Sequence, residues 1–450
     1  MSINNSIREN FILLLSDMIL KKQVSRKLTF LMESQFWNEE KLVKFQKDRL
    51  HLLVNHVYQN VPYYTKLFKR LGLTPSDFKN LEDLRKLPIM NKDNVREAIK
   101  SGELISRNIN KKVLLYNSSS GSTGEPLQFY ETKTSDSIKK AAALRGWYWM
   151  GYRLGDKFIK VSQIPRNSIL KKIQDVFTNS LYLHIPQIND GSFANIIEQI
   201  EKFNPKFLRI YPDPLNLLVG YMKKEGIRIN SITAINTTGS ILTPEVRANA
   251  EDVFNCKIYD GFSCEGGAVV FECPTHECYH SAMEQAFTEV LDNKGNPAIK
   301  GRLITTDLWN FATPFIRYDT QDIVELGDHP CNCERALMPV KQIYGRESDI
   351  LITPSGQYLI VNNFTGHFQW INEVEQFQVH QHLLNKFVVY LKVNSSYSKS
   401  TESLILSILK SIIKEDVEII IQLVNEIPLS KSGKRRFLIR NDEVKLPHNA

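Results

Sequence analysis

The sequence has 450 residues, of which 42% are hydrophobic, 24% charged and 10% aromatic, a composition that excludes extended disorder. The formal net charge of +8 comes from 57 basic and 49 acidic residues spread along the chain, which disfavours a nucleic-acid partner. The length exceeds that at which one hydrophobic core keeps growing, so we expect one large and one smaller domain.

The start of the chain resembles neither a membrane span nor an export signal. Its most apolar stretch, residues 11–20, is broken by Ser16 and Asp17, and the acidic Glu9 stands where a secretory signal carries basic residues. The six cysteines all lie in the middle of the chain, unlike a secreted disulfide framework. We therefore expect no membrane span and a cytoplasmic location.

Residues 1–110 are predicted to form a mainly helical preface, because apolar positions such as Phe11, Leu14, Leu15 and Met18 recur at spacings of three and four. From residue 113 to about residue 343, short β-rich apolar runs alternate with helical segments. This alternation predicts an α/β architecture with mainly parallel strands. The apolar runs include residues 158–161, 207–210 and 232–236, and residues 193–203 are one of the helical segments.

Gly345, Pro354 and Gly356 punctuate the chain near residues 346–356 and indicate a break. We place a large N-terminal domain at residues 1–347 and a small, mobile C-terminal α+β (ferredoxin-like) domain at residues 348–450. In the small domain we expect strands at residues 377–379, 387–393 and 417–423, and a helix at residues 401–413.

The first segment with a clear chemical use is Tyr116-Asn-Ser-Ser-Ser-Gly-Ser-Thr-Gly-Glu-Pro126, which follows a strand-like run. Glycines let the backbone wrap closely, so N–H groups and hydroxyls can hold phosphate oxygens. The segment lacks the Gly-Lys-Ser/Thr of a Walker loop, which disfavours a P-loop ATPase. No histidine can be assigned to its serines, so a serine hydrolase is unsupported.

Together with five later segments, this loop resembles the phosphate loop of adenylate-forming enzymes, the superfamily of acyl-CoA synthetases and luciferases. Pro314-Phe-Ile-Arg-Tyr318 and the Cys-x-Cys before the hinge are most similar to the phenylacetate–CoA ligase and capsule-biosynthesis branch. The later segments are Thr237-Thr-Gly-Ser240, Tyr259-Asp-Gly-Phe-Ser-Cys-Glu-Gly266, Thr313-Pro-Phe-Ile-Arg-Tyr-Asp-Thr-Gln-Asp322, Gly345-Arg-Glu-Ser-Asp349 and Pro428-Leu-Ser-Lys-Ser-Gly-Lys-Arg435.

The resemblance implies an AMP-forming acid ligase. ATP and Mg²⁺ convert a small carboxylic acid into an acyl-AMP with release of pyrophosphate, and CoA then takes the acyl group. An amine or a carrier-protein thiol is the alternative acceptor. A non-catalytic basic binding protein on a ligase scaffold is a reading of a different class, which the joint presence of Lys434, Glu265, Asp322 and Arg346 disfavours. A homodimer is left open.

The resemblance also implies roles for individual residues. Lys434 reaches the α-phosphate and the carboxylate, because a crowded anionic transition state needs a cation. Glu265 holds Mg²⁺, Asp322 accepts hydrogen bonds from the ribose with Arg346 as a second contact, and Asp349 is the hinge. The remaining predicted ATP and AMP contacts are Ser119, Ser120, Gly121, Ser122, Thr123, Gly124, Gly239, Ser240, Phe262 and Ser263.

Two assignments keep alternatives. Phe262, as the aromatic side chain that stacks on adenine, stands one residue closer to Glu265 than the family spacing, so Tyr259 stays in reserve.

Thiols and imidazoles gather in two groups, which is typical of a structural zinc site. Relatives in this branch point to Cys273, His280, Cys331 and Cys333 as the zinc ligands, with His276 and Cys278 as alternates and buried thiols without metal as the other reading.

Three segments rich in apolar and aromatic side chains are expected to surround the acid. They favour an aromatic or medium-sized acid over a long fatty acid, although the tryptophans among them could equally fill the core. The segments are residues 147–152, 211–218 and 235–239.

Overall fold

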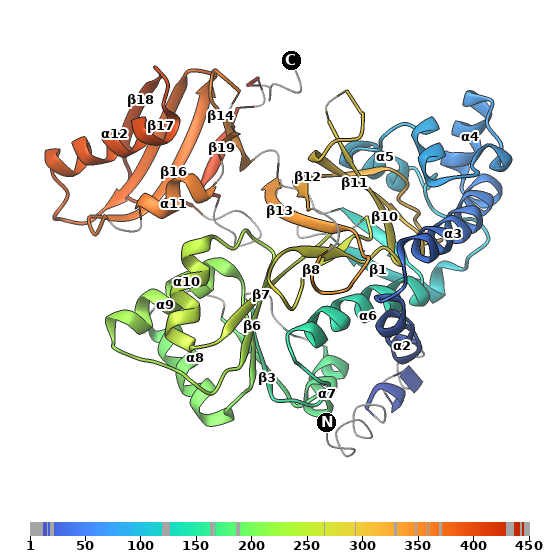
Figure 1. Cartoon of the computed structure of the whole chain (residues 1–450), viewed down its shortest axis with the longest axis horizontal. Coiled ribbons are helices and arrows are strands. Elements are labelled where there is room, and N and C mark those ends of the chain that lie inside the picture. Colours follow the sequence, from blue (N-terminus) through green and yellow to red (C-terminus); the bar gives the residue numbers. More distant parts are fainter. Residues whose placement is uncertain are drawn as a thin grey trace.

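The computed structural model of the chain consists of a large domain built on one mixed sheet and a smaller α+β domain that holds the C-terminal part (Figure 1). It describes residues 12–15, 17–18, 22–118, 127–162, 166, 168–185, 190–264, 266–292, 294–327, 331–346, 349–356, 358–359, 361–368, 371–428, 436–441 and 443–444. The α/β class agrees with the prediction from the sequence.

The part of the chain that precedes the first strand forms α-helices and short 3-10 helices, which pack together. Helix α3 (Glu39–Asn60) begins where the Asn38 side chain accepts a hydrogen bond from the Lys41 N–H, and it ends just before Pro62, which starts α4 (Pro62–Leu71). The other elements are α2 (Val24–Ser34), η1 (Pro75–Asp77), η2 (Leu81–Lys86), α5 (Lys92–Lys100) and η3 (Lys111–Val113).

Within the described residues, eleven strands form one sheet in the order β10-β11-β12-β13-β9-β8-β7-β6-β5-β3-β4. Strands β4, β3, β5, β6 and β7 run parallel. Parallel neighbours need a crossover, so helices cover both faces: α6 lies on one face, and α8, α9 and α10 lie on the other (Figure 1).

In this parallel half, β3 and β5 lie within one residue of the runs expected at residues 158–161 and 207–210, β6 begins two residues later than the run at residues 232–236, and α8 contains the helical segment at residues 193–203. The elements of this half are α6 (Lys133–Trp149), β3 (Phe158–Ser162), α7 (Ile169–Phe177), β4 (Ser180–His184), α8 (Asp190–Phe203), β5 (Phe207–Arg209), α9 (Pro212–Lys224), β6 (Ala234–Thr238), α10 (Pro244–Phe254) and β7 (Lys257–Ser263).

The other half of the sheet is antiparallel, which differs from the expectation of mainly parallel strands. Short turns join most of these strands in sequence, and a strand joined to its neighbour by a short turn can pair only antiparallel. The strands are β8 (Val269–Glu272), β9 (Tyr279–Ser281), β10 (Ala286–Leu291), β11 (Lys300–Asp307), β12 (Tyr318–Leu326) and β13 (Pro339–Arg346).

Inside the antiparallel half, a short pairing of β9 with β13 joins β8 and β9, which follow the parallel strands through β7, to strands β10–β13. Its register consists of Pro339 opposite His280 and Val340 opposite Tyr279. Proline has no backbone N–H to donate to the ladder, so this pairing offers few hydrogen bonds. Other contacts must therefore help to keep these two groups of strands together.

A separate antiparallel hairpin, β1 (Leu115–Ser118) with β2 (Gln128–Glu131), carries the predicted phosphate loop at its tip. In the C-terminal domain, the described residues form a sheet in the order β18-β17-β16-β19 with its own apolar core. The elements are β14 (Leu351–Ile352), β15 (Tyr358–Leu359), α11 (Val361–Phe368), β16 (Val374–Leu383), β17 (Lys386–Val393), α12 (Lys399–Ile413), β18 (Glu418–Leu423) and β19 (Leu438–Arg440).

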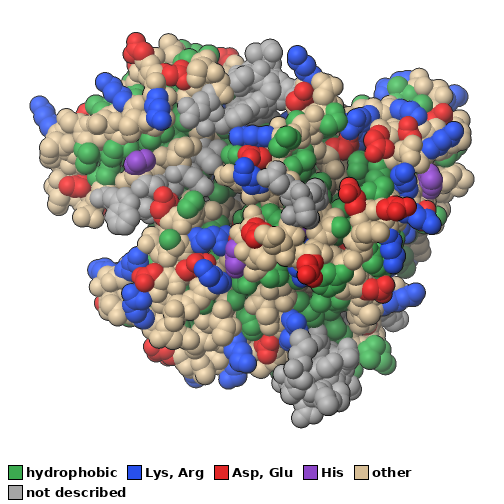
Figure 2. Space-filling model, in the orientation of Figure 1, with side chains coloured by type: hydrophobic (Ala, Val, Ile, Leu, Met, Phe, Trp, Pro, Cys, Tyr) green, Lys and Arg blue, Asp and Glu red, His purple; other side chains and the backbone are tan. Residues whose placement is uncertain are grey.

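Charged side chains are mixed on the face drawn in Figure 2, where Lys and Arg are interspersed with Asp and Glu. Among the described helices, none combines the length and the apolar composition needed to cross a lipid bilayer.

A buried ion pair fastens the helical preface to the sheet domain. Arg145 of α6 is 2% exposed and binds Glu284, which is 0% exposed, with Nη1 to Oε1 at 2.8 Å. The Ser34 hydroxyl of α2 also donates to Glu284, and Arg145 donates to the Leu31 carbonyl. Both charges are therefore satisfied without water.

We expect Glu284→Gln to lower the free energy of unfolding by about 3–5 kcal/mol, because it leaves the buried Arg145 charge without a carboxylate. Replacing both residues by Met should recover much of that loss. Urea unfolding measures the change, and Lys257→Met, which breaks the exposed Lys257–Glu251 pair, is the control at under about 1 kcal/mol. Equal, small effects of Glu284→Gln and Lys257→Met would contradict the structural role of the buried pair.

Candidate functional site

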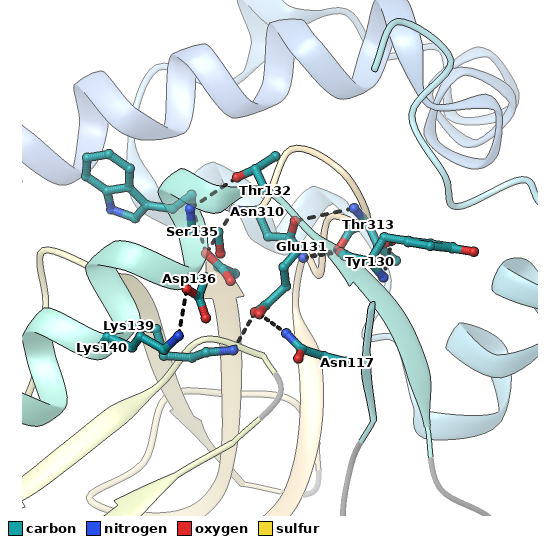
Figure 3. A network of polar contacts seen from close by, with 12 residues as sticks. Asn117, Tyr130, Glu131, Thr132, Ser135, Asp136, Lys139, Lys140, Asn310 and Thr313 are labelled. Carbon is teal, nitrogen blue, oxygen red and sulfur yellow. Dashed lines mark hydrogen bonds and ion pairs between the residues drawn. The ribbon is translucent and has the colours of Figure 1, made fainter. Parts of the chain in front are cut away.

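The hairpin that carries the predicted phosphate loop is held at its base by a buried ion pair. Glu131, at the end of β2, is 1% exposed and binds Lys139 Nζ of α6 at 2.5 Å. The Asn117 amide of β1 donates to the same carboxylate, so β1, β2 and α6 meet at Glu131 (Figure 3). The loop contacts themselves lie outside the described residues: Ser119, Ser120, Gly121, Ser122, Thr123 and Gly124.

A second buried carboxylate, Asp307 of β11, lies beside this clamp. It accepts hydrogen bonds from the N–H groups of Trp309 at 2.8 Å and Asn310 at 3.1 Å. Burial raises the pKa of Asp307 to about 7, and the nearby Glu131 carboxylate raises it as well. A Cβ on Gly267 would stand 2.8 Å from the Asp307 carboxyl carbon, so this close approach requires glycine. Glu265 lies just before it, outside the described residues.

The turn after β6 packs against the hinge motif. Gly239 has a φ of +89°, and a Cβ there would lie 3.2 Å from the Tyr211 ring. A Cβ on Gly345, with a φ of +91°, would lie 2.6 Å from Ile241. Ser240 Oγ is buried and has no hydrogen-bond partner in the part of the chain that the structure describes. The turn thus leaves one polar atom for a ligand.

Strand β7 sends neighbouring side chains to opposite faces. Asp260 accepts hydrogen bonds from the Thr237 hydroxyl at 2.7 Å and the Tyr279 hydroxyl at 3.2 Å, and burial raises its pKa to about 7. Phe262 packs with the apolar side chains of the antiparallel half, whereas the Tyr259 ring lies 4.5 Å from the His276 ring. Ser263 is the last residue of the strand. The adenine-stacking role stays a prediction for either aromatic residue.

The predicted ribose contacts lie opposite each other. Asp322 of β12, which is 6% exposed, pairs in register with Arg346 of β13. A few residues later, Asp349 accepts hydrogen bonds from Arg436 Nε at 3.0 Å and Nη2 at 2.7 Å. Arg436 resumes the described chain after the loop of Lys434, which itself lies outside the described residues. The predicted hinge is therefore tied to the base of the lysine loop.

The two cysteine groups come together beside the β9–β13 pairing. The distances are 3.9 Å between Cys273 Sγ and Cys331 Sγ, 3.4 Å between Cys278 Sγ and Cys331 Sγ, and 3.6 Å between Cys278 Sγ and His280 Nε2. Cys333 Sγ lies 2.9 Å from the same His280 nitrogen. The ligand atoms of Cys273, Cys278, His280 and Cys331 thus all lie within 4.8 Å of one another, with Cys333 beside His280.

The imidazole of His280 is oriented by the backbone. Its Nδ1 lies 2.9 Å from the Leu337 carbonyl oxygen, which can only accept, so the proton is on Nδ1 and the Nε2 lone pair faces the thiols. Hydrogen bonds from Cys278 and Cys333 lower the pKa of Cys273, while Cys273 raises the pKa of both of those thiols. A thiolate at Cys273 therefore disfavours loss of the proton from Cys278 and from Cys333, unless a cation binds beside them.

His276 lies apart from the cluster, although it was an alternate ligand. Its Nδ1 is 3.1 Å from Glu272 Oε1, and the other Glu272 oxygen accepts from the Asp260 N–H at 2.9 Å and from Arg247 at 3.0 Å. Glu272 directly precedes Cys273. The cysteine turn is thus linked to the middle of β7.

Sequence reasoning missed Lys160 of β3, Arg209 of β5 and the Glu131–Lys139 pair. A signal for the first two was present, because strands covered by helices on both faces are nearly all apolar, and a cation inside one of them is an exception. Glu131 and Lys139 gave no such signal, since charged residues at the end of a strand and in a helix usually face solvent.

Residues 351–441 match the family model described as the CapK C-terminal domain. The protein CapK of Staphylococcus aureus is 25% identical over 415 residues, which cover 89% of this chain and 89% of that protein. A phenylacetate–coenzyme A ligase of Thermus thermophilus is 27% identical over 335 residues, covering 70% and 72%. A solved 2-hydroxyisobutyryl-CoA ligase with 2-HIB-AMP, in its post-adenylation state, has a TM-score of 0.74 at 17% identity and covers 91% of this chain and 92% of that one. The resemblance inferred from the motifs is confirmed.

The raised pKa of Asp260 predicts a pH-dependent stability. Between about pH 4 and pH 7 the folded carboxyl keeps a proton that the unfolded one has lost, so the wild type should lose stability as the pH rises, by up to about 1.4 kcal/mol per unit. Asp260→Asn should remove this loss, and the exposed Asp252→Asn should not. Urea unfolding at several pH values measures it. A constant difference between wild type and Asp260→Asn over that range would contradict the assignment.

Proposed function

We propose that this chain, an adenylate-forming ligase related to CapK and to the phenylacetate–coenzyme A ligases, activates a small carboxylic acid with ATP and transfers the acyl group to CoA. The observation that carries the proposal is a convergence of segments from both halves of the sheet and from the C-terminal domain. Gly345 packs against Ile241, Asp322 lies opposite Arg346, and Asp349 binds Arg436.

In the first half-reaction, a carboxylate oxygen of the acid forms a bond to the α-phosphorus of ATP, and the bond to the β-phosphate breaks to release pyrophosphate. Negative charge gathers on the α-phosphate, so donors and cations must be in place beforehand. The loop between β1 and β2 would hold the phosphates, and Asp322 would accept hydrogen bonds from the ribose hydroxyls. Mg²⁺ held by Glu265 would neutralise phosphate charge when bound.

In the second half-reaction, the acceptor attacks the acyl carbon and AMP leaves. The phenylacetate–coenzyme A ligase relatives support a CoA thiol as the acceptor. An amine or a carrier-protein thiol is the competing acceptor. AMP release that depends on CoA, measured with preformed acyl-AMP, separates these cases.

The cysteine cluster suits a structural zinc ion. Thiolates and an imidazole are the ligands that zinc prefers, and the His280 lone pair already faces the thiols. Cys273, His280 and Cys331 would supply three ligands, and either Cys278 or Cys333 would complete the four-coordinate set. A metal here would add strength beside the short β9–β13 pairing.

We expect Lys434→Ala to reduce acyl-AMP formation by about 10² to 10³ in rate while ATP binding stays nearly intact, because one preorganised electrostatic contact is lost. Consumption of supplied acyl-AMP with CoA should remain, since the lysine acts only on the α-phosphate step. Single-turnover kinetics of each half-reaction measure this, with the exposed Lys410→Ala of α12 as the control. Equal loss in both half-reactions, or none in adenylation, would contradict the role of Lys434.

For the metal, we expect near-stoichiometric zinc in the untagged protein and a lower melting temperature after chelation. Cys273→Ser should lose the metal, and His276→Ala should keep it because His276 binds Glu272. Of Cys278→Ser and Cys333→Ser, the variant that keeps zinc identifies the thiol that is not a ligand. Elemental analysis that finds no zinc in the wild type removes the metal proposal.

A further inference from the structure

Two cations lie side by side in the parallel half of the sheet. Lys160 of β3 pairs in register with Tyr182 of β4 on one side and with Arg209 of β5 on the other, and Arg209 pairs with Asn236 of β6. Residues in register on neighbouring strands point to the same face. Phe158, two positions before Lys160, belongs to the apolar core under α6, so this cationic row faces α6.

The indole of Trp147, near the end of α6, lies against both cations. Its ring centroid is 5.5 Å from Lys160 Nζ and 5.9 Å from Arg209 Cζ. Trp147 Nε1 donates to Asn236 Oδ1 at 3.1 Å, while the Asn236 amide donates to the carbonyls of Thr237 and Tyr259, each at 3.0 Å. Both the oxygen and the nitrogen of the Asn236 side-chain amide thus have partners, and the amide holds the Trp147 ring in place.

The positive charge of the row is not balanced by the protein. Within the described part of the chain, neither the Lys160 ammonium nor the Arg209 guanidinium has a hydrogen bond or an ion pair. Asp175, the carboxylate that acts on Lys160, already binds Arg166 at 2.6 Å. Burial lowers the pKa of Lys160 to about 8, and Arg209 and Arg166 oppose its charge further. Lys160 and Arg166 therefore share one carboxylate, while Arg209 interacts with the hydroxyls of Tyr211 and Tyr182.

The cationic row lies close to the predicted nucleotide site, toward the carboxyl ends of the parallel strands, where such sheets bind ligands. Asn236 is three residues before Gly239, a distance of about 10 Å along an extended chain. Tyr211, two residues after Arg209, packs against Gly239. A small molecule that reaches from the turn at Gly239 to Trp147 would meet both cations.

We propose that the acid activated by this chain carries a second anionic group, which Lys160 and Arg209 bind while the reacting carboxylate faces the nucleotide. The inference rests on the proposed function and names its substrate class. Lys160 and Arg209 are half-buried, a cation that is partly removed from water is stabilised by an anionic partner, and their donors can form charge-assisted hydrogen bonds to one anionic group. The Trp147 ring beside them suits a short aliphatic or aromatic spacer.

The test compares matched acids in ATP–pyrophosphate exchange: adipate with hexanoate, and 1,4-phenylenediacetate with phenylacetate. We expect each diacid to have a kcat/KM at least about tenfold above its partner. Arg209→Met should raise the KM for the diacid about 30-fold, the effect of removing one member of a hydrogen-bonded charge pair, and change the KM for the monoacid far less. Lys160→Met should act in the same direction. Lys206→Met, at an exposed residue just before β5, is the control.

Preference of the wild type for both monoacids, unchanged by Arg209→Met, would overturn the inference while the ligase function stands. A rise in the KM for ATP and pyrophosphate with either acid would assign the cations to phosphate and overturn it as well. If no acid supports exchange, but adipate still raises the melting temperature of wild type and not of Arg209→Met, the function fails and the anion subsite stands.

Discussion

The short pairing between β9 and β13 is the constraint on which the rest of the large domain depends. It joins β9, which is connected through β8 and β7 to the parallel strands, to β13, which together with β12 carries Asp322 and Arg346. Only two residue pairs define its register, and one includes a proline. The cysteine and histidine cluster lies at this pairing, with His280 in β9 and Cys331 and Cys333 just before β13. A cation bound there would strengthen the weakest part of the sheet.

Because both halves contribute, the proposed site is assembled by tertiary structure rather than by one motif. The link from the cysteine turn through Glu272 to Asp260 connects the cluster to β7, and the clamp of Glu131 and Lys139 fixes the base of the phosphate loop from α6. The C-terminal domain enters through Asp349 and Arg436. Each contact joins elements that are far apart in the sequence.

Much of this could be predicted from the sequence where local pattern and residue chemistry agree. The apolar runs at residues 158–161 and 387–393 became β3 and β17, and the spacing of thiols and imidazoles indicated a cluster before any contact was known. The antiparallel half was not predicted, since strand direction depends on pairing. The roles of Asp260 and Lys160 were also missed, because burial of a charge is a property of the packed sheet.

The central claim is that the two halves of the sheet form one site that activates a carboxylic acid on ATP. Isotope exchange between pyrophosphate and ATP by the wild-type chain, over a panel of mono- and dicarboxylic acids without any acceptor, tests it most directly, because it reports acyl-AMP formation alone. The account predicts exchange that requires an acid and Mg²⁺. Tight ATP binding without exchange for any acid would contradict it.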